Sequence, residues 1–447
     1  MSLPLTLSAY RFAMRLATPL SGALLSLRLN RAKEDPLRVD ERRGFASLAR
    51  PEGPLVWLHG ASVGEALSLL PLVERLTQSG RGALMTTGTV TSARLLAQRL
   101  PAGALHQFAP LDAPGFMRRF FAHWRPDLAL IAESELWPNM ILEARRAGAP
   151  LVMVNARMSA RSFARWRRVP DFIAALLAQV DLCLAQSEAD AERLVGLGAA
   201  AVRVAGNLKF DAPAPPADRR ELAALAGLTS GRQIWIAAST HDGEERIAAE
   251  AHKRVAQTFP DALTLITPRH PARGEAILAE LQALGLPCAL RSRGERPERE
   301  TAIYICDTIG ELGLFYRLAG VVMVGKSFVG QGGQNPIEPA KLASAILHGP
   351  HVANFADVYA LLDEAGGAAL ARDAEELAAT LAVLFADPAR LRAMARAAAE
   401  AVGTQGGAAD RVMQALAPFL PAANPRALIC SPPAFGRASA RAWRRAR

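Results

Sequence analysis

The stretch WLHGASVGEALSLLPLVERL, residues 57–76, decides the fold class. An apolar run typical of a buried strand ends in small residues, and a helical pattern follows at once. Open α/β sheets place their ligands at the carboxyl ends of parallel strands, so this turn predicts a ligand site. Glu65 is the one carboxylate in the turn. The helix dipole alone also favours an acid in a first helical turn, and both interpretations stay open at this point.

Apolar strand patterns alternate with helical patterns in two series along the chain. The first series has strands expected at 55–59, 83–87, 128–132, 151–155, 182–185 and 202–205. The second has strands expected at 234–238, 263–267, 303–306, 321–324 and 345–347. This alternation predicts an α/β protein with two Rossmann-like, doubly wound domains. We expect the two domains to face one another across a ligand-binding cleft.

The domain boundaries follow from the same patterns. Residues 34–210 and 220–420 are the two predicted domains, and the proline-rich segment 211–219 is the predicted linker. Residues 1–33 form a predicted N-terminal helix, and residues 421–447 form a basic tail rich in Ala and Arg. The chain of 447 residues, 51% hydrophobic and 21% charged, can bury large cores and is not a disordered protein.

The net charge of +10 is concentrated at the ends of the chain. Residues 1–33 and 426–447 together carry eleven basic residues and no acid, so the rest of the chain is close to neutral. This distribution favours an anionic membrane surface as a partner and argues against nucleic acid. The four cysteines are widely spaced and form no CxxC pair, which favours a reducing compartment without a zinc site.

The first thirty residues predict a membrane-associated helix. They are rich in Leu and Ala, but Arg11 and Arg15 leave only 16–27 as an uncharged run, too short for the roughly 20 residues of a span. We therefore expect a monotopic or peripheral helix on the cytoplasmic face of the membrane. The basic residues after the apolar run argue against a cleaved signal peptide. An ordinary amphipathic helix packed on the domain is the alternative.

Polar side chains follow several of the expected strands. In the first domain, Glu133 and Glu135 follow one strand, and we expect only one of them to face the cleft. Lys209 follows the last strand before the linker. The cluster of arginines that could bind phosphate consists of Arg157, Arg161, Arg165 and Arg168, with Arg167 beside them. Helix capping, ion pairing and a solvated charged face are the alternatives.

The second domain has polar segments at the corresponding places. They are ASTHDGEE at 238–245, TPRHP at 267–271, DTIGELGLFY at 307–316 and GQGGQNPIEPA at 330–340. A small-residue loop before a helix is a common phosphate-binding arrangement, although each segment alone could be ordinary turn chemistry. Four such segments after successive strands indicate a nucleotide site.

The order of these motifs resembles the bacterial 3-deoxy-D-manno-octulosonic acid (Kdo) transferases of lipopolysaccharide biosynthesis. The similarity runs through HGASVGE, TTGTVTSA, IAESELWPN, NARMSARS, AQSEADAERLVGLGA, GNLKFD, ASTHDGEE, TPRHP, DTIGELGLFY and GGQNPIEPA, over residues 41–420. It implies a glycosyltransferase of the GT-B architecture. The donor would be CMP-Kdo and the acceptor a lipid A precursor (lipid IVA), at the inner face of the cytoplasmic membrane.

The resemblance also assigns residues. It implies that Glu65 is the general base of an inverting transfer, with Glu133 and Lys209 supporting the transition state. The residues implied to hold the CMP group are Pro268, Arg269, Ile309, Gly310, Glu311, Asn335, Pro336, Ile337 and Glu338. The chain departs from the commonest family pattern at Gln334, where histidine is frequent, and at Lys326, where glycine is frequent.

The expected chemistry needs no cofactor. Because the sequence has no DxD motif or His cluster, we expect no metal, with cations and helix ends stabilising the leaving phosphate. Two other classes stay open: a sugar-nucleotide epimerase with the same two-domain fold and no lipid acceptor, and a non-catalytic scaffold at the membrane surface.

Overall fold

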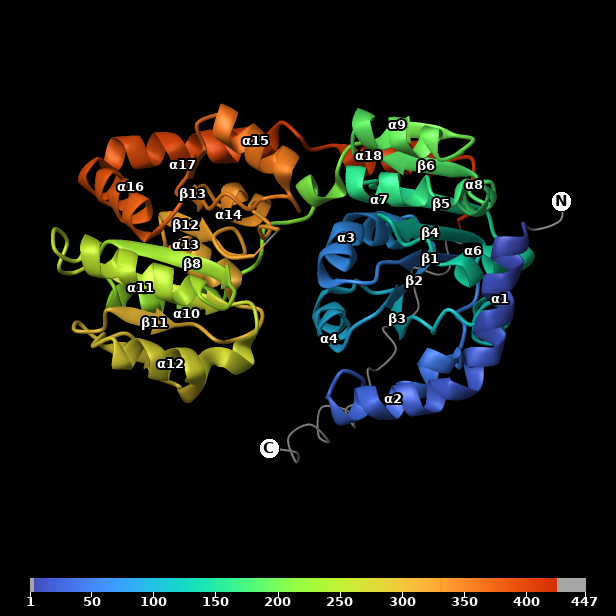
Figure 1. The fold of residues 1–447 in the computed structure, drawn as a ribbon, viewed down its shortest axis with the longest axis horizontal. Helices are drawn as coiled ribbons and strands as arrows, with labels where there is room; N and C mark the ends of the chain where they lie inside the picture. Colours follow the sequence, from blue (N-terminus) through green and yellow to red (C-terminus); the bar gives the residue numbers. More distant parts are fainter. Residues whose placement is uncertain (1–3, 331, 424–447) are drawn as a thin grey trace. The chain divides into compact units, whose positions relative to one another are not determined.

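The computed structural model describes residues 4–330 and 332–423. The chain divides into two compact units, Met1–Ala212 with Gly406–Arg447 and Pro213–Gln405. Each unit contains a seven-stranded sheet whose strand pairs are all parallel (Figure 1). The predicted α/β class with two doubly wound domains is therefore confirmed. The predicted tail at 421–447 lies outside the described residues from position 424 onward.

The sheet of unit 1 has the order β3-β2-β1-β4-β5-β6-β7. Its strands are β1 (Leu55–His59), β2 (Gly82–Thr87), β3 (Ala104–Phe108), β4 (Leu128–Ala132), β5 (Leu151–Ala156), β6 (Leu182–Ala185) and β7 (Val202–Val204). The chain builds the sheet outward from β1 to β3, then returns to the other side of β1 with β4. The topological switch point therefore lies between β1 and β4, which is where a doubly wound sheet binds its ligand.

Helices cover both faces of this sheet because alternate strand residues point to opposite sides. Leu55 and Trp57 of β1 belong to one core and Val56 and Leu58 to the other. The first core is closed by α5 (Pro114–Trp124), α6 (Pro138–Arg146), α8 (Pro170–Leu177) and α9 (Glu188–Gly196). The second is closed by α3 (Val63–Gln78), α4 (Val90–Arg99) and α18 (Ala408–Leu416). The short α7 (Ala160–Trp166) follows β5.

The N-terminal segment forms two helices along one side of unit 1 (Figure 1). Helix α1 (Leu5–Ala17) ends at a turn that contains Pro19, and α2 (Ser21–Asn30) follows. Leu7 and Leu25 are fully or almost fully buried, so the alternative of helices packed on the domain is correct in part. None of the helices in the described chain is long and apolar enough to cross a bilayer.

The sheet of unit 2 has the order β10-β11-β9-β8-β12-β13-β14. Its strands are β8 (Ile234–Thr240), β9 (Leu263–Pro268), β10 (Cys288–Leu290), β11 (Ile303–Ile305), β12 (Val321–Val324), β13 (Ala345–His348) and β14 (Ala368–Leu370). Its switch point lies between β8 and β12, the strands that carry two of the predicted polar segments.

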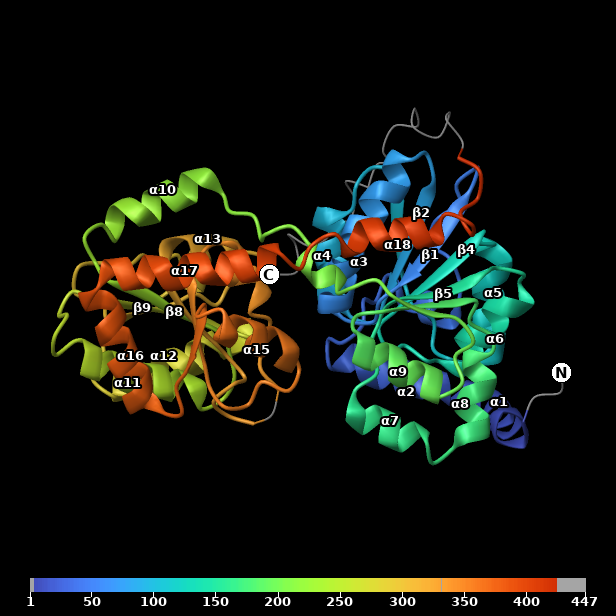
Figure 2. The same ribbon diagram turned by 90° about the horizontal axis from the view of Figure 1, so that it is seen from above.

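The helices of unit 2 also form two layers (Figure 2). One core is closed by α11 (Glu244–Val255), α12 (Gly274–Ala283) and α16 (Ala374–Ala386). The remaining helices are α10 (Arg219–Leu228), α13 (Leu312–Leu318), α14 (Ile337–Lys341), α15 (Ala356–Glu364) and α17 (Pro388–Gly403). Helices α13 and α17 contact β8 and β13 respectively, and α10 contacts α13.

The compact units differ from the predicted domain ranges at the C-terminal side. Helix α18 falls within the predicted range 220–420, but its apolar face completes a core of unit 1. The Asp211 carboxylate accepts hydrogen bonds from the backbone N–H groups of Gly407 and Ala409, at 2.7 and 2.5 Å, and so caps this helix. The predicted linker at 211–219 is divided between the two units after Ala212. Its later part packs on unit 2, where the Pro215 carbonyl accepts a hydrogen bond from Arg317.

Candidate active site

Glu65 lies at the start of α3, directly after β1, as predicted. Ser62 caps this helix, and its hydroxyl donates to Oε1 of Glu65 at 2.8 Å. The backbone N–H of Ala61 donates to Oε2 at 2.7 Å. Glu65 is therefore part of the helix cap, and the cap also fixes its carboxylate at the switch point of the sheet.

The surroundings of Glu65 raise its pKa. Burial is the main cause, because it disfavours the charged form, and the carboxylates of Glu135 and Glu133 add to it. The hydrogen bonds from Ser62 and Ala61 act in the opposite direction. A carboxylate with a raised pKa is a stronger base than an ordinary surface glutamate.

Glu133 follows β4, on the other side of the switch point, and forms an ion pair with Lys209. Its Oε1 lies 2.6 Å from Nζ of Lys209, and the two side chains are only 15% and 14% exposed. Glu133 has a φ of 52°, in the left-handed region that side chains other than glycine rarely adopt. Such backbone strain clusters at functional sites. Two residues that the resemblance assigns to the site thus come together from turns far apart in the sequence.

Lys209 reaches this position through a short turn after β7. It lies in a 3-10 helix, Leu208–Phe210, and the backbone N–H of Leu208 donates to the Asn155 side chain at 2.9 Å. Asn155 is the penultimate residue of β5 and also has a left-handed φ, 52°. The side chain of Asn155 therefore ties the turn that carries Lys209 to the same edge of the sheet.

Glu135 also lies near Glu65, because its charge helps to raise the pKa of Glu65. That only one of the two acids faces the cleft stays a prediction. Its Oε2 lies 3.7 Å from Nε2 of His59, and its carboxylate accepts a hydrogen bond from the indole of Trp137. Burial acts to raise the pKa of Glu135, but the interactions with His59 and Trp137 prevail and lower it. The turn after β4 thus keeps both acids close to Glu65 and does not separate them.

The arginine cluster extends from this edge onto α7. Arg161, Arg165 and Arg168 are exposed, whereas Arg157 is half-buried. The carbonyl of Arg157 accepts a hydrogen bond from Ser134, which joins the loop after β5 to the loop after β4. Only the start of the cluster is thereby linked to the loop that carries Glu133.

In unit 2, the predicted CMP-binding residues follow three strands close together in the sheet. Pro268 ends β9, Ile309–Glu311 follow β11, and Asn335–Glu338 follow β12. Because β11 adjoins β9 and only β8 separates β9 from β12, these segments meet at one edge of the sheet. Arg269 is exposed there, and its backbone N–H donates to the carbonyl of Thr240 at 2.9 Å.

Glu311 is held by a cation that the sequence analysis did not single out. Arg291 donates to both of its carboxylate oxygens, at 2.6 and 2.5 Å. This pair is the main reason that the pKa of Glu311 is lowered. The preceding residues, Ile309 and Gly310, are exposed, and Gly310 has a left-handed φ of 88°. The pair with Arg291 fixes one end of the exposed turn.

The loop after β12 is shaped by Glu244, which is fully buried. Its carboxylate accepts hydrogen bonds from the backbone N–H groups of Lys326, Ser327, Phe328 and His241, at 2.6 to 3.0 Å. Downstream, the Asn335 side chain accepts from the N–H of Ile337 at 3.0 Å. The two positions that depart from the family pattern lie in this region: Gln334 bonds His241 at 3.0 Å, and Lys326 adopts a left-handed φ of 58°.

Four residues of these sites have roles that were not predicted from the sequence: His59, Asn155, Arg291 and Glu244. His59, Asn155 and Glu244 lie within the motifs quoted above, but most of their partners are distant in sequence and only the fold reveals them. Within 4–330 and 332–423, no group of three or more His, Cys, Asp or Glu side chains is placed to hold a metal ion.

The fold and the sites at both switch points define the class of the protein as an α/β protein of the GT-B architecture. The structure of S. aureus MnaA with UDP has the same fold, with a TM-score of 0.57 at 14% identity, and the match covers 86% of this chain and 100% of the other. At this identity the likeness concerns the fold alone.

Sequence relatives identify the family. The family profile described as 3-Deoxy-D-manno-octulosonic-acid transferase (kdotransferase) matches residues 37–212. The 3-deoxy-D-manno-octulosonic acid transferase of Bordetella pertussis is 37% identical, over 92% of this chain and 99% of its own length. The probable mitochondrial 3-deoxy-D-manno-octulosonic acid transferase of Arabidopsis thaliana is 35% identical, over 80% and 82% respectively. The chain belongs to the Kdo transferase family, and the predicted resemblance is confirmed.

Proposed function

We propose that this protein transfers Kdo from CMP-Kdo to a lipid A precursor, lipid IVA, in lipopolysaccharide core biosynthesis. In this proposal unit 2 binds the donor, unit 1 supplies the general base, and the reaction inverts the anomeric configuration. The single observation that carries the catalytic part is the Glu65 carboxylate. It is fixed at the switch point of unit 1 by two hydrogen bonds and has a raised pKa.

A sugar hydroxyl is a poor nucleophile at neutral pH, so its attack needs a base. Glu65 would accept the hydroxyl proton as the oxygen attacks the anomeric carbon from the face opposite the nucleotide. The C–O bond to the phosphate breaks as the new glycosidic bond forms, and CMP leaves. The ion pair of Glu133 and Lys209 would orient the reacting groups and place a cation near the developing charge.

The donor would bind at the carboxyl edge of the unit 2 sheet. Arg269 offers an exposed cation there, and the turn at Gly310 leads into α13. Asn335 lies just before the short α14 and Glu338 lies in its first turn, where both could contact the nucleotide. The chain's own cations and backbone N–H groups would stabilise the leaving phosphate, without a cofactor or a metal.

The acceptor is an acylated, phosphorylated sugar, which calls for a basic surface near a membrane. The arginines of the cluster on α7 would bind its phosphates. Replacing Arg161, Arg165 and Arg168 together by Gln should raise KM for the acceptor and leave KM for CMP-Kdo unchanged. An unchanged acceptor KM would remove these residues from the proposal.

We also propose that the N-terminal helices hold the protein on the cytoplasmic face of the inner membrane, as a monotopic or peripheral protein. The large apolar side chains that α1, α2 and the turn between them expose are Leu5, Phe12, Leu16, Leu20, Leu24 and Leu27. Leu5 and Leu20 are 89% and 70% exposed, which is costly in water and favourable in the acyl-chain boundary.

The direct test is to incubate the purified protein with CMP-Kdo and lipid IVA in mixed micelles. The proposal predicts acceptor-dependent release of CMP and a Kdo-containing lipid product. Consumption of a soluble UDP-sugar without a lipid acceptor would favour an epimerase, and absence of both reactions would favour a scaffold.

A further inference from the structure

Arg42 is a buried cation that joins two loops at the carboxyl edge of unit 1. It is 4% exposed and lies in the 3-10 helix Val39–Arg43. Its Nη1 donates to the carbonyl of Ala109, after β3, at 2.9 Å, and its Nη2 donates to the carbonyl of Gly88, after β2, at 2.5 Å. One planar guanidinium thus fixes both loops at once.

The Gly88 end of this contact leads directly to Glu65. The backbone N–H of Gly88 donates to the carbonyl of Ala61 at 2.9 Å, and the N–H of Ala61 donates to the Glu65 carboxylate at 2.7 Å. The two loops approach so closely that a Cβ atom on Gly88 would lie 2.9 Å from the Ala61 carbonyl oxygen. The loop at Ala61, which binds the Glu65 carboxylate, is therefore fixed by the loop at Gly88, which Arg42 binds.

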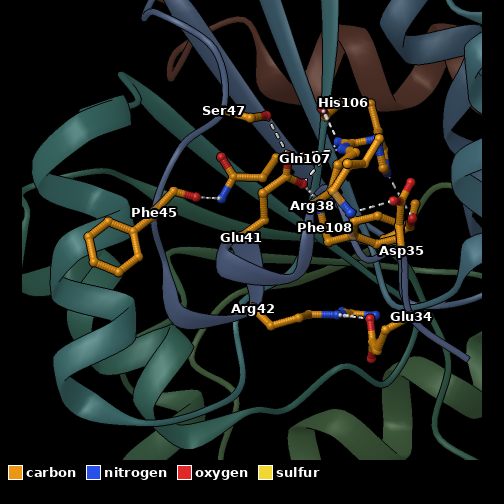
Figure 3. Close-up of polar contacts among 12 residues, drawn as sticks. Glu34, Asp35, Arg38, Glu41, Arg42, Phe45, Ser47, His106, Gln107 and Phe108 are labelled. Atoms are coloured by element: carbon orange, nitrogen blue, oxygen red, sulfur yellow. Dashed lines mark hydrogen bonds and ion pairs between the residues drawn. The ribbon is translucent and has the colours of Figure 1, made fainter. Parts of the chain in front are cut away.

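Glu34 completes the arrangement on the other side of Arg42 (Figure 3). It is 5% exposed, and its Oε2 accepts from Nε of Arg42 at 2.8 Å. Its Oε1 accepts from Arg28 on α2 at 2.6 Å. The buried pair is thereby connected to the N-terminal helices.

We propose that Arg42, oriented by Glu34, is a positioning residue for Glu65 that acts through Gly88 and Ala61. The inference deepens the proposed function, because it rests on Glu65 being the general base. Arg42 touches no reacting group; it fixes the backbone N–H that binds the Glu65 carboxylate. Weakening that hydrogen bond removes an interaction that favours the charged carboxylate.

Glu65 and Arg42 each have charged neighbours that affect their titration. Glu65 faces the carboxylates of Glu135 and Glu133. In turn, His59 lies beside Glu135 and Lys209 beside Glu133. Arg42 interacts with Glu34, Arg28 and Glu41. When the hydrogen bond from the Ala61 N–H is weakened by a change at Arg42, the pKa of Glu65 should rise further.

Arg38 provides a matched control from the same region (Figure 3). Its guanidinium donates to both oxygens of Glu41, at 2.9 Å each, and to the carbonyl of His106 at 2.9 Å. Glu41 in turn accepts from the N–H of Phe108 at 2.7 Å. This second Arg–Glu pair ends on β3, and its hydrogen bonds named here go to neither Gly88 nor Ala61.

The experiment compares Arg42→Lys with Arg38→Lys, and uses Glu34→Gln as a second, milder variant of the Arg42 site. Hydrogen exchange of the peptide containing 60–64 should become faster in Arg42→Lys and Glu34→Gln, and stay unchanged in Arg38→Lys. The acid limb of the pH profile of kcat should move up by roughly half a pH unit in the first two variants only. A structural role alone would lower stability without moving this limb.

Two results would overturn the inference. Unchanged exchange at 60–64 in both Arg42-site variants would remove the link to the loop, and faster exchange with an unmoved acid limb would remove its consequence for Glu65. Glu65→Gln is measured alongside them. An active Glu65→Gln enzyme would contradict the base assignment itself. If Glu65→Gln is inactive but the acid limbs of Arg42→Lys and Glu34→Gln do not move, only the role of Arg42 is contradicted.

Discussion

Replacing Lys209 by Met removes the cation from a largely desolvated ion pair with Glu133. At a separation of 2.6 Å the attraction is about 6 kcal/mol for an effective dielectric constant of about 20. Part of it is offset by the cost of desolvating the two charges, and each side chain is about one-seventh exposed. We expect a net loss of about 2–3 kcal/mol in the free energy of unfolding of unit 1, because Glu133 stays buried without its partner.

The loss can be measured by urea unfolding followed by hydrogen exchange of peptides from β4, which report unit 1 alone. The midpoint should fall by about 1 M urea. Glu133→Gln combined with Lys209→Met should recover at least half of the loss, because the uncompensated charge is gone. Transfer activity should stay low in both, since the pair supports the reaction and not only the fold.

If Lys209→Met unfolds at the same urea concentration as the parent protein, the ion pair does not stabilise unit 1. A double variant less stable than Lys209→Met alone would likewise show that the unpaired Glu133 charge is not the cause of the loss. Full activity of the double variant would leave the pair with a structural role only.

Three further predictions follow from other parts of unit 1. Glu135→Gln removes a carboxylate that raises the pKa of Glu65, so the acid limb of the kcat profile should move to lower pH; a limb that stays in place or moves up would contradict the assigned neighbours. Burial, with the charges of Arg38 and Arg42, lowers the pKa of His106 from 6.5 to about 3, so its contribution to stability is present above pH 6.5 and lost as the pH falls toward 3. His106→Gln should therefore flatten the pH dependence of urea unfolding between pH 6.5 and 4, and an unchanged slope would oppose this. Changing three exposed apolar residues to Ser should weaken binding to anionic vesicles about tenfold or more in a sedimentation assay, while equal binding would exclude the helices as the membrane contact; these residues are Leu16, Leu20 and Leu24.

Most of the fold could be predicted because buried parallel strands are continuous apolar runs. Four strands, β1, β4, β6 and β12, begin and end at the predicted residues. Strand β3 was missed because it contains the polar residues His106 and Gln107. Their partners, Arg38 and Trp124, come from elsewhere in the chain, so burial of these side chains leaves no local pattern. Strands β10 and β14 were also missed. They have three residues each, like β7 and β11, but their sequences CAL and AAL lack the β-branched residues that mark β7 (VRV) and β11 (IYI) as strands.

The candidate site was predictable only as a set of strand ends. The position of Glu65 follows from a turn of a few residues, and the turn is local. Other contacts depend on the order of the strands in the sheet, which local sequence patterns do not determine. They are the ion pair of Glu133 with Lys209 and the hydrogen bonds that connect Arg42 to Glu65. The return of α18 to unit 1 was missed for the same reason. The apolar face of an amphipathic helix shows that the helix packs on a core, but it does not show on which core.

The central claim is that Glu65 removes the acceptor proton, and Glu65→Gln tests it most directly. The amide keeps the shape of the side chain but cannot accept the proton, so single-turnover transfer of Kdo to the lipid acceptor should slow by about a hundredfold or more. Binding of CMP to the same preparation, measured by calorimetry, should be unchanged. Transfer within a factor of two of the parent rate, with intact CMP binding, would contradict the account.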